Sequence, residues 1–321
     1  MQKLERLQIP LMLLILLALF LVPVYAWATG SLYPLTLFGR ILVFALAALG
    51  LNLVLGFGGM VSLGHAMYVG LGAYAVGVMS YMGIASGPVH LAAALLVTAL
   101  VALPVGWIAL RTHGIAFIMI TLAFAQLFFY VFVSMRMLGG DDGMSIERLS
   151  DWGFGLAGNK YAIYLALLVS IVLTLWGMTR LVASRFGLVL RATKASEKRV
   201  NAVGTASLPY RLMAYVISAE ICAVAGYFLA NLTGFVSPAY MTWMISGELI
   251  VMALLGGSGF VFGPVVGAVA FLMMEEGLKA YTERWALFLG PIIVLIVVFL
   301  RLGLWGLLAK RGEQISGGGH H

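Results

Sequence analysis

The sequence predicts an all-α polytopic membrane protein, and three observations support this prediction. Hydrophobic residues make up 63% of the 321 residues and charged residues only 10%, against roughly 45–50% and about 25% in soluble domains. The 19 Lys and Arg and the 12 Asp and Glu residues gather in a few short stretches. Between these stretches lie apolar runs that approach the roughly 20 residues a membrane-spanning helix needs. A water-soluble globule and a disordered chain are therefore excluded.

Ten apolar segments are candidates for membrane-spanning helices, although the eighth and ninth are short and interrupted by glycine. They are residues 9–29, 38–56, 62–83, 89–110, 114–135, 161–180, 210–231, 244–258, 262–278 and 285–306. We expect about ten transmembrane helices in one domain, residues 1–312, followed by a tail, residues 313–321, that includes the remnant of an expression tag.

The first segment also resembles a signal peptide. Lys3 and Arg6 precede it, and Ala26-Trp27-Ala28 has the form of a cleavage site. The apolar core of a signal peptide is only about 7 to 15 residues long, whereas this segment is long enough to cross the membrane. We therefore interpret it as the first span.

Basic residues predict the orientation, because Lys and Arg are retained on the cytoplasmic side. With the N-terminus inside, 13 of the 19 basic residues fall in cytoplasmic segments and six fall outside. The cytoplasmic set is Lys3, Arg6, Arg111, Arg180, Arg185, Arg191, Lys194, Lys198, Arg199, Arg211, Arg301, Lys310 and Arg311; the outer set is Arg40, Arg136, Arg148, Lys160, Lys279 and Arg284. Five spans followed by five, with both termini inside, predict a 5+5 inverted repeat.

Residues 56–65, the glycine segment, are the first candidate for function. Glycine costs a helix interior about 1 kcal/mol relative to alanine, so this density predicts a broken or re-entrant segment or very close helix packing. Backbone groups freed by a break need protein or a water-filled cavity as partners, and a polar solute can use the same groups. We expect the substrate pathway to involve Gly56, Gly58, Gly59, Ser62, Gly64, His65 and Glu248. Packing is the alternative, and it is favoured for Gly70–Gly77 and for residues 256–267.

Two carboxylates fall in the interior of apolar segments, at Glu220 and Glu248, with Asn52 and Gln126 as neutral polar companions, whereas Glu275 and Glu276 close a segment and are expected in the outer interface. A charge in mid-membrane usually faces a cavity or a partner. Glu248 lies near the outer end of a short span, where water could reach it and where its presence would carry no functional information.

The predicted cytoplasmic loop at residues 181–209, here called the basic loop, places five cations around one acid. Helix formers and apolar residues over residues 188–203 predict a short amphipathic helix along the membrane face, which Gly204 could end. The loop could contact anionic lipid headgroups or dock a partner protein, and composition does not separate these. Its candidate residues are Arg185, Arg191, Lys194, Glu197, Lys198, Arg199 and Gly204.

The sequence lacks the motifs of several enzyme classes. It contains no G-x-x-x-x-G-K-[ST] phosphate loop, no H-E-x-x-H, no paired-cysteine metal pattern and no G-x-S-x-G elbow. We therefore expect no catalytic residues, no metal and no ATP hydrolysis by this chain alone. The net charge of +7 is explained by topology rather than by nucleic-acid binding.

Several of these motifs together resemble the LivM-type permease subunits of branched-chain amino acid ABC transporters. The similarity covers roughly residues 40–305 and is carried by residues 51–66, 114–126, 139–143, 184–192, 246–249 and 256–257. It implies an ABC importer permease fold in a bacterial inner membrane, with both termini cytoplasmic. It also implies import of branched-chain or other hydrophobic amino acids. The sequence departs from the family at Glu220, where a small apolar residue is usual.

The resemblance also implies partners. These are a homologous second permease subunit, two ATP-binding subunits that use the ATP, and a periplasmic solute-binding protein, besides membrane lipid; no cofactor is bound by this chain. The basic loop would contain the coupling helix that fits the ATPase. We expect Asp141 and Asp142 to be among the contacts with the binding protein.

Two alternatives remain open. Related permeases carry urea or short amides with nearly the same motifs. An ion-coupled secondary transporter would also use an inverted repeat and broken helices, with Glu220, Glu248 and His65 as coupling groups.

Overall fold

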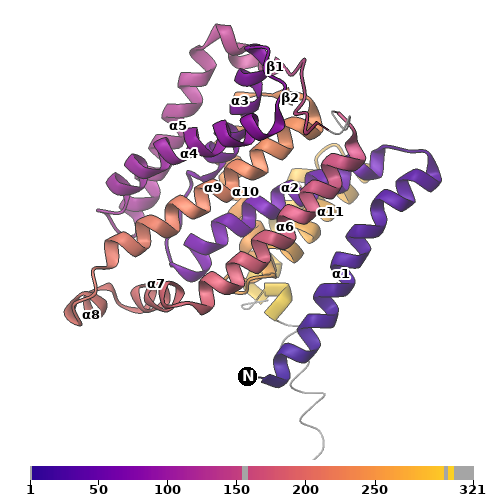
Figure 1. Ribbon diagram of the computed structural model, residues 1–321. Helices are drawn as coiled ribbons and strands as arrows, with labels where there is room; N and C mark the ends of the chain where they lie inside the picture. The colour runs from indigo at the N-terminus through magenta and orange to yellow at the C-terminus, as the bar shows by residue number, and fades with distance from the viewer. Residues whose placement is uncertain (1, 154–157, 300–302, 307–321) are drawn as a thin grey trace, which may run out of the picture.

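The computed structural model describes residues 2–153, 158–299 and 303–306, which form a helical bundle (Figure 1). One long helix falls on each of the ten predicted segments. They are α1 (Gln2–Thr29), α2 (Tyr33–Asn52), α3 (His65–Tyr81), α4 (Gly87–Ala109), α5 (Ile115–Ser134), α6 (Lys160–Ala183), α9 (Ser207–Thr233), α10 (Trp243–Gly256), α11 (Gly263–Tyr281) and α12 (Trp285–Phe299). The predicted tail, residues 313–321, lies outside the described residues.

Within the described residues, six helices are long and apolar enough to cross a membrane. They are Pro10–Thr29, Tyr33–Phe57, Gly87–Ala109, Ile115–Ser134, Lys160–Ala183 and Ser207–Thr233. The helices α3, α10 and α12 are shorter, and α11 carries three charged residues near its end. The all-α membrane architecture is confirmed in this coarser form, while the count of ten spans and the inverted repeat stay predictions.

The helix α2 forms the centre of the bundle. Every residue from Ile41 to Asn52 is buried, and α2 packs against α6, α9, α10 and α11. A helix that is apolar all round is expected in such an interior position. The helix α5 is the opposite case, because only Phe117, Thr121 and Ala125 on it are buried.

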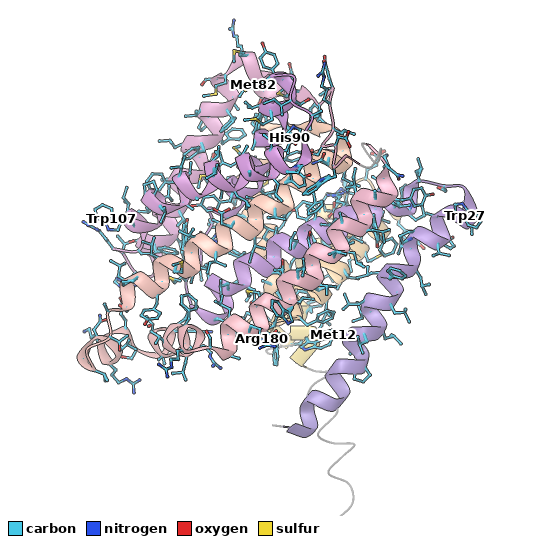
Figure 2. The ribbon with its side chains drawn as sticks, viewed as in Figure 1. Met12, Trp27, Met82, His90, Trp107 and Arg180 are labelled. Atoms are coloured by element: carbon cyan, nitrogen blue, oxygen red, sulfur yellow. The ribbon has the colours of Figure 1, made fainter. Side chains whose placement is uncertain are left out.

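The outer surface of the bundle is apolar. Figure 2 labels Trp27 and Trp107 at its periphery, and their side chains are 79% and 47% exposed. Large exposed apolar side chains also recur along α1, α4, α5, α6 and α12. A soluble monomer rarely exposes apolar patches on this scale, so this surface suits the hydrocarbon of a bilayer.

Two glycines bring the backbones of α3 and α9 into contact. A Cβ atom at Gly72 would overlap the carbonyl oxygen of Ala223, and one at Gly226 would overlap that of Val69. The glycines of α3 therefore serve close helix packing, the alternative favoured for this stretch. The second glycine-rich stretch does the same, because Gly267 of α11 lies directly against the backbone of α10.

Two short strands depart from the all-α prediction. β1 (Met144–Ser145) pairs antiparallel with β2 (Phe235–Val236), which joins the loop after α5 to the loop after α9. Near this pair, the Ser150 N–H donates to Asn231 Oδ1 at 2.9 Å. Figure 1 shows β1 and β2 at one end of the bundle, and the beginning of α1 with α7 (Arg185–Ala195) and α8 (Glu197–Ala202) at the other.

We predict that Gly226→Ala lowers the stability of the purified protein by about 1–3 kcal/mol, the usual cost of overpacking, because the new methyl group would push α9 away from α3. The measurement is thermal unfolding in detergent. The matched control is Gly177→Ala in α6, which has open space around it and should gain up to about 1 kcal/mol from helix propensity. Equal melting temperatures for the two variants would contradict this account of the α3–α9 contact.

Candidate pathway and coupling site

The glycine segment is a break between two helices, as predicted. The helix α2 continues as a π-helical turn, Leu53–Phe57, then residues 58–64 follow an irregular path, and α3 begins at His65. Gly59 has φ +68°, a left-handed conformation that favours glycine. Its N–H donates to the Leu55 carbonyl at 3.2 Å, so the first part of the break is still bonded to the π-helical turn.

Side chains from other helices satisfy the second part of the break. The Leu63 N–H donates to Thr121 Oγ1 of α5 at 3.2 Å, and the Ala66 N–H donates to Ser246 Oγ of α10 at 3.0 Å. The first N–H groups of a helix have no partner within the helix, so Ser246 caps α3 from a distant part of the chain. Sequence analysis did not single out Thr121 or Ser246, because a lone hydroxyl in an apolar helix carries no signal of its partner.

Ser62 and His65 lie in a closed aromatic environment. Both are fully buried, and His65 Nδ1 is 2.9 Å from Ser62 Oγ. The rings of Tyr68 and Tyr215 lie edge-on to His65 at 5.8 and 5.4 Å between centroids. Among the described residues, nothing bonds His65 Nε2. Gly64 packs beside them against Thr121, so these three predicted residues are grouped but enclosed.

Asn52 joins the glycine segment to the second glycine-rich stretch. Its Nδ2 donates to the Phe260 carbonyl at 2.9 Å, and its Oδ1 accepts from the Gly259 N–H at 3.2 Å. A Cβ atom at Gly56 would lie 2.6 Å from Gly259 N. The two stretches therefore form one seam, and Gly56 is required for their close approach.

Glu248 does not join the glycine segment. Ser246 faces α3, and Glu248 is two residues further along α10, about 200° around the helix. The charged groups that act on Glu248 are Arg40, Glu275 and Lys279. Of these, Glu275 forms an ion pair with Arg40 at 3.3 Å. The position therefore gives no support to Glu248 as a neighbour of Ser62 and His65, and its role in the pathway stays a prediction.

Besides His65, four residues within the spans have buried polar atoms without hydrogen bonds in the described part of the chain. They are Tyr74 and Thr98 at their hydroxyl groups, Gln126 of α5 at Nε2 and Glu220 of α9 at both carboxylate oxygens. An unpaired carboxyl group is costly in a membrane, and nothing in the structure explains this departure from the family pattern.

The basic loop forms two helices rather than the single one predicted. The helix α7 ends at Ala195, Ser196 is extended with φ −167° and ψ 104°, and α8 begins at Glu197. Ser196 Oγ accepts from the Arg199 N–H at 3.4 Å, so this serine caps α8 and fixes the division.

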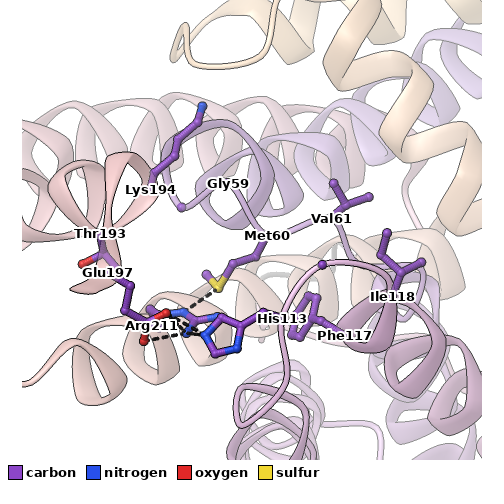
Figure 3. A pocket seen from close by; sticks show the side chains of 12 residues that line it. Gly59, Met60, Val61, His113, Phe117, Ile118, Thr193, Lys194, Glu197 and Arg211 are labelled. Atoms are coloured by element: carbon purple, nitrogen blue, oxygen red, sulfur yellow. Dashed lines mark hydrogen bonds and ion pairs between the residues drawn. The ribbon is translucent and has the colours of Figure 1, made fainter. Parts of the chain in front are cut away.

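Lys194 connects the basic loop to the glycine segment. Its Nζ donates to the Gly56 carbonyl at 2.7 Å, and its methylene stem lies over Gly59, where an added Cβ would be 2.7 Å from Lys194 Cγ. A predicted coupling residue thus contacts two predicted pathway residues, and Figure 3 shows Lys194 beside Gly59. Cations are favoured at such a site because the carbonyl end of a helix carries partial negative charge.

Glu197 is the centre of a second group of contacts, which we call the Glu197 cluster: Glu197, Arg211, His113 and Ser207. Glu197 accepts from Arg211 Nη1 at 2.9 and 3.0 Å, lies 2.7 Å from His113 Nε2 and accepts from Ser207 Oγ at 2.7 Å. Partial burial opposes ionisation of Glu197, but the bonds from Ser207 and His113 and the charge of Arg211 outweigh it and lower the pKa of Glu197.

The roles of Arg211 and His113 in this cluster were missed by sequence analysis. We counted Arg211 only among the basic residues that predict the orientation. A cation in the first turns of an apolar span, after a loop with a single acid, could have indicated an ion pair with that acid. Arg211 is 5% exposed, so it needs a partner. A cavity of about 180 Å³ separates this cluster from Gly59 and Lys194, as Figure 3 shows.

The remaining predicted coupling residues stay outside these contacts. Arg191 bonds the carbonyls at the α6–α7 junction, with Nε 3.3 Å from Gly187 O. Arg185, Lys198 and Arg199 are exposed, and Gly204 follows α8 with φ +86°, as expected for a residue that ends a helix. Asp141 and Asp142 are exposed in the short helix Gly140–Asp142, in the same loop as β1.

Comparisons with known proteins give a family and several relatives. The family described as "Branched-chain amino acid transport system / permease component" matches residues 33–299. The high-affinity branched-chain amino acid transport permease LivM of Salmonella typhimurium is 28% identical over 288 residues, 82% of this chain and 68% of that protein. The corresponding LivH permease of Escherichia coli is 25% identical over 281 residues, 82% of this chain and 91% of that protein.

A more distant relative is archaeal. The probable branched-chain amino acid transport permease LivM of Methanocaldococcus jannaschii is 24% identical over 302 residues, 83% of this chain and 86% of that protein. No solved structure matches the chain.

We predict that Ser246→Ala destabilises the protein by about 1–3 kcal/mol, because it leaves the buried Ala66 N–H without an acceptor. Thermal unfolding in detergent measures the effect. Ser170→Ala is the control, because Ser170 is only partly buried on α6 and its hydroxyl bonds the Ala166 carbonyl of its own helix; it should leave the melting temperature nearly unchanged. A melting temperature of Ser246→Ala equal to that of the wild type would rule out the capping role.

We also predict a pH dependence from Glu197. A pKa lower in the folded than in the unfolded state means that Glu197 stabilises the fold fully above its ordinary value of 4.5 and loses this contribution as the pH falls below it. The difference in melting temperature between wild type and Glu197→Gln should therefore be constant near neutral pH and shrink in acid. Repeating the series in His113→Gln removes the other titrating group of the cluster, and a difference that grows in acid would refute the assignment.

Proposed function

This chain belongs to the family of branched-chain amino acid transport permeases, and we propose that it is the LivM-type transmembrane subunit of an ATP-driven importer. It carries branched-chain or other hydrophobic amino acids across a bacterial inner membrane, with both termini in the cytoplasm. A homologous second permease completes the pathway, which the similarity to both LivM and LivH relatives supports. Two separate subunits hydrolyse ATP, a periplasmic protein delivers the solute, and this chain binds no cofactor.

The observation that supports this function best is the contact between Lys194 and Gly56. An importer driven by a separate ATPase needs a mechanical path from a cytoplasmic surface to the solute route. The Lys194 Nζ lies 2.7 Å from the Gly56 carbonyl oxygen, at the start of the irregular segment. A displacement of α7 therefore reaches the pathway segment through one charge-assisted hydrogen bond.

An apolar groove along α7 and α8 is the face we assign to the ATPase. It has a volume of about 440 Å³ and includes Leu188, Val200 and Val203, of which Leu188 and Val203 are 63% and 85% exposed. Side chains this exposed and apolar suit a protein partner better than water. Arg199 borders the groove and supplies a charge at its rim.

The binding protein docks at the opposite end. Asp141 and Asp142 are exposed there, in the loop that β1 and β2 hold to the end of α9. A loop fixed in this way presents its carboxylates at a defined position, which favours recognition by basic residues of a partner.

The two alternatives receive less support. An ion-coupled transporter with one coupling site would place His65 and Glu248 together, but His65 contacts Ser62 and the tyrosines, while Glu248 faces the charges of α2 and α11. An importer of urea or short amides differs from our proposal only in the solute, and competition experiments distinguish the two.

We predict that proteoliposomes with both permeases and the ATPases accumulate radiolabelled leucine only when ATP and the binding protein are both supplied. Excess isoleucine or valine should compete, and urea or acetamide should not. The control is the purified chain alone under a proton or sodium gradient, which should show no uptake. Uphill uptake by the chain alone would overturn the proposal. Competition by urea would show that the solute is urea or a short amide instead of a branched-chain amino acid.

A further inference from the structure

Two side chains, those of Lys194 and Glu197, attach α7 and α8 to different parts of the bundle. Lys194, near the end of α7, bonds the carbonyl of Gly56 at 2.7 Å. Glu197, the first residue of α8, bonds α9 and the turn between α4 and α5. Along the chain, Lys194 and Glu197 are separated by Ala195 and Ser196. Ser196 has extended backbone angles.

The attachment at Glu197 is saturated. An ionised carboxylate has about four lone-pair sites, and the two oxygens of Glu197 together have four contacts, with Ser207, His113 and twice with Arg211 Nη1. The side chain of Arg211 is only 6% exposed, against 26% for Glu197. Bonds in which both partners are charged are stronger than neutral ones, so this attachment is a rigid one.

The attachment at Lys194 is of a different kind. A single flexible side chain holds one carbonyl, and its stem lies directly against Gly59, where an added Cβ would be 2.7 Å from Lys194 Cγ.

The cavity lies between the two attachments and leaves them unpacked against each other. Its volume of about 180 Å³ would hold roughly six water molecules. Across it, Arg211 Nε reaches Met60 Sδ at 3.4 Å, a weak contact with the middle of the glycine segment. Figure 3 shows Arg211 and Glu197 on one side and Lys194 with Gly59 on the other.

We infer that Arg211 is a positioning residue for coupling: through Glu197 it fixes α8 to α9 and to the α4–α5 turn, so that Ser196 acts as the hinge about which α7 moves. Force applied to α7 then passes through Lys194 to the glycine segment instead of displacing α7 and α8 together. The inference depends on the proposed function, because it assigns a role within ATP-driven transport.

The test measures ATP hydrolysis and leucine uptake in the same proteoliposomes, with the complete transporter. Glu197→Gln keeps the shape of the side chain and removes the charge, and Arg211→Lys keeps the charge and removes the planar fork. Each should lower the leucine imported per ATP hydrolysed by about tenfold, which corresponds to 1.4 kcal/mol, while ATP hydrolysis continues. Glu283→Gln is the matched control, because it makes the same change of charge at an exposed position between α11 and α12 that has no part in the cluster or the basic loop, and it should leave the ratio unchanged.

A purely structural role predicts a different result. It would lower protein yield, hydrolysis and uptake together and leave their ratio unchanged. The exchange of the two residues, Glu197→Arg with Arg211→Glu, should recover part of the ratio because the pair is restored. A folded Glu197→Gln transporter with the wild-type ratio overturns the inference, as does a ratio that stays constant in every variant.

Failure of the proposed function gives a separate result. In that case the wild-type vesicles themselves show no ATP-dependent uptake. If Arg211→Lys does not fold, Glu197→Gln still decides, and hydrogen exchange on the full chain provides a second measurement: α8 should exchange faster in Glu197→Gln while residues 56–65 keep their wild-type protection. Faster exchange in both regions would show that α8 and the glycine segment are a single unit and would overturn the hinge.

Discussion

An irregular backbone inside a membrane must find hydrogen-bond partners within the protein or in enclosed water, because lipid offers none. Residues 56–66 meet this constraint with partners from three other helices. Thr121 of α5 and Ser246 of α10 accept N–H groups, and Lys194 of α7 donates to the carbonyl of Gly56. The break is therefore stable only where these helices converge, which links its conformation to the position of each of them.

The same constraint explains why α7 contacts the glycine segment. The break leaves the carbonyl of Gly56 available, and Lys194 of α7 donates to it. A structural requirement of the membrane thus brings α7 against the glycine segment, and the proposed coupling depends on this contact.

Features that depend on composition and periodicity could be predicted from this sequence, whereas contacts between residues far apart along the chain could not. The positions of the ten helices follow from hydropathy, and the break at residues 56–65 follows from glycine density. The partner of Asn52 is more than 200 residues away at Gly259 and Phe260, and no local pattern indicates it. Glu248 was predicted to line the pathway, but it lies on the opposite side of α10 from Ser246, to which sequence analysis gave no role. We predicted one helix over residues 188–203 because helix-forming residues lie on both sides of Ser196. The sequence does not show that this serine caps a second helix.

The pairing of β1 with β2 affects the order in which the chain can fold during synthesis. Its first strand emerges from the ribosome with the fifth helix, but its second strand follows α9, some 90 residues later in synthesis. The core helix α2 likewise waits for α9, α10 and α11 before it is enclosed. Domains otherwise tend to fold from the N-terminus as they are translated, but here α2 and β1 complete their packing only after the later helices have been synthesised.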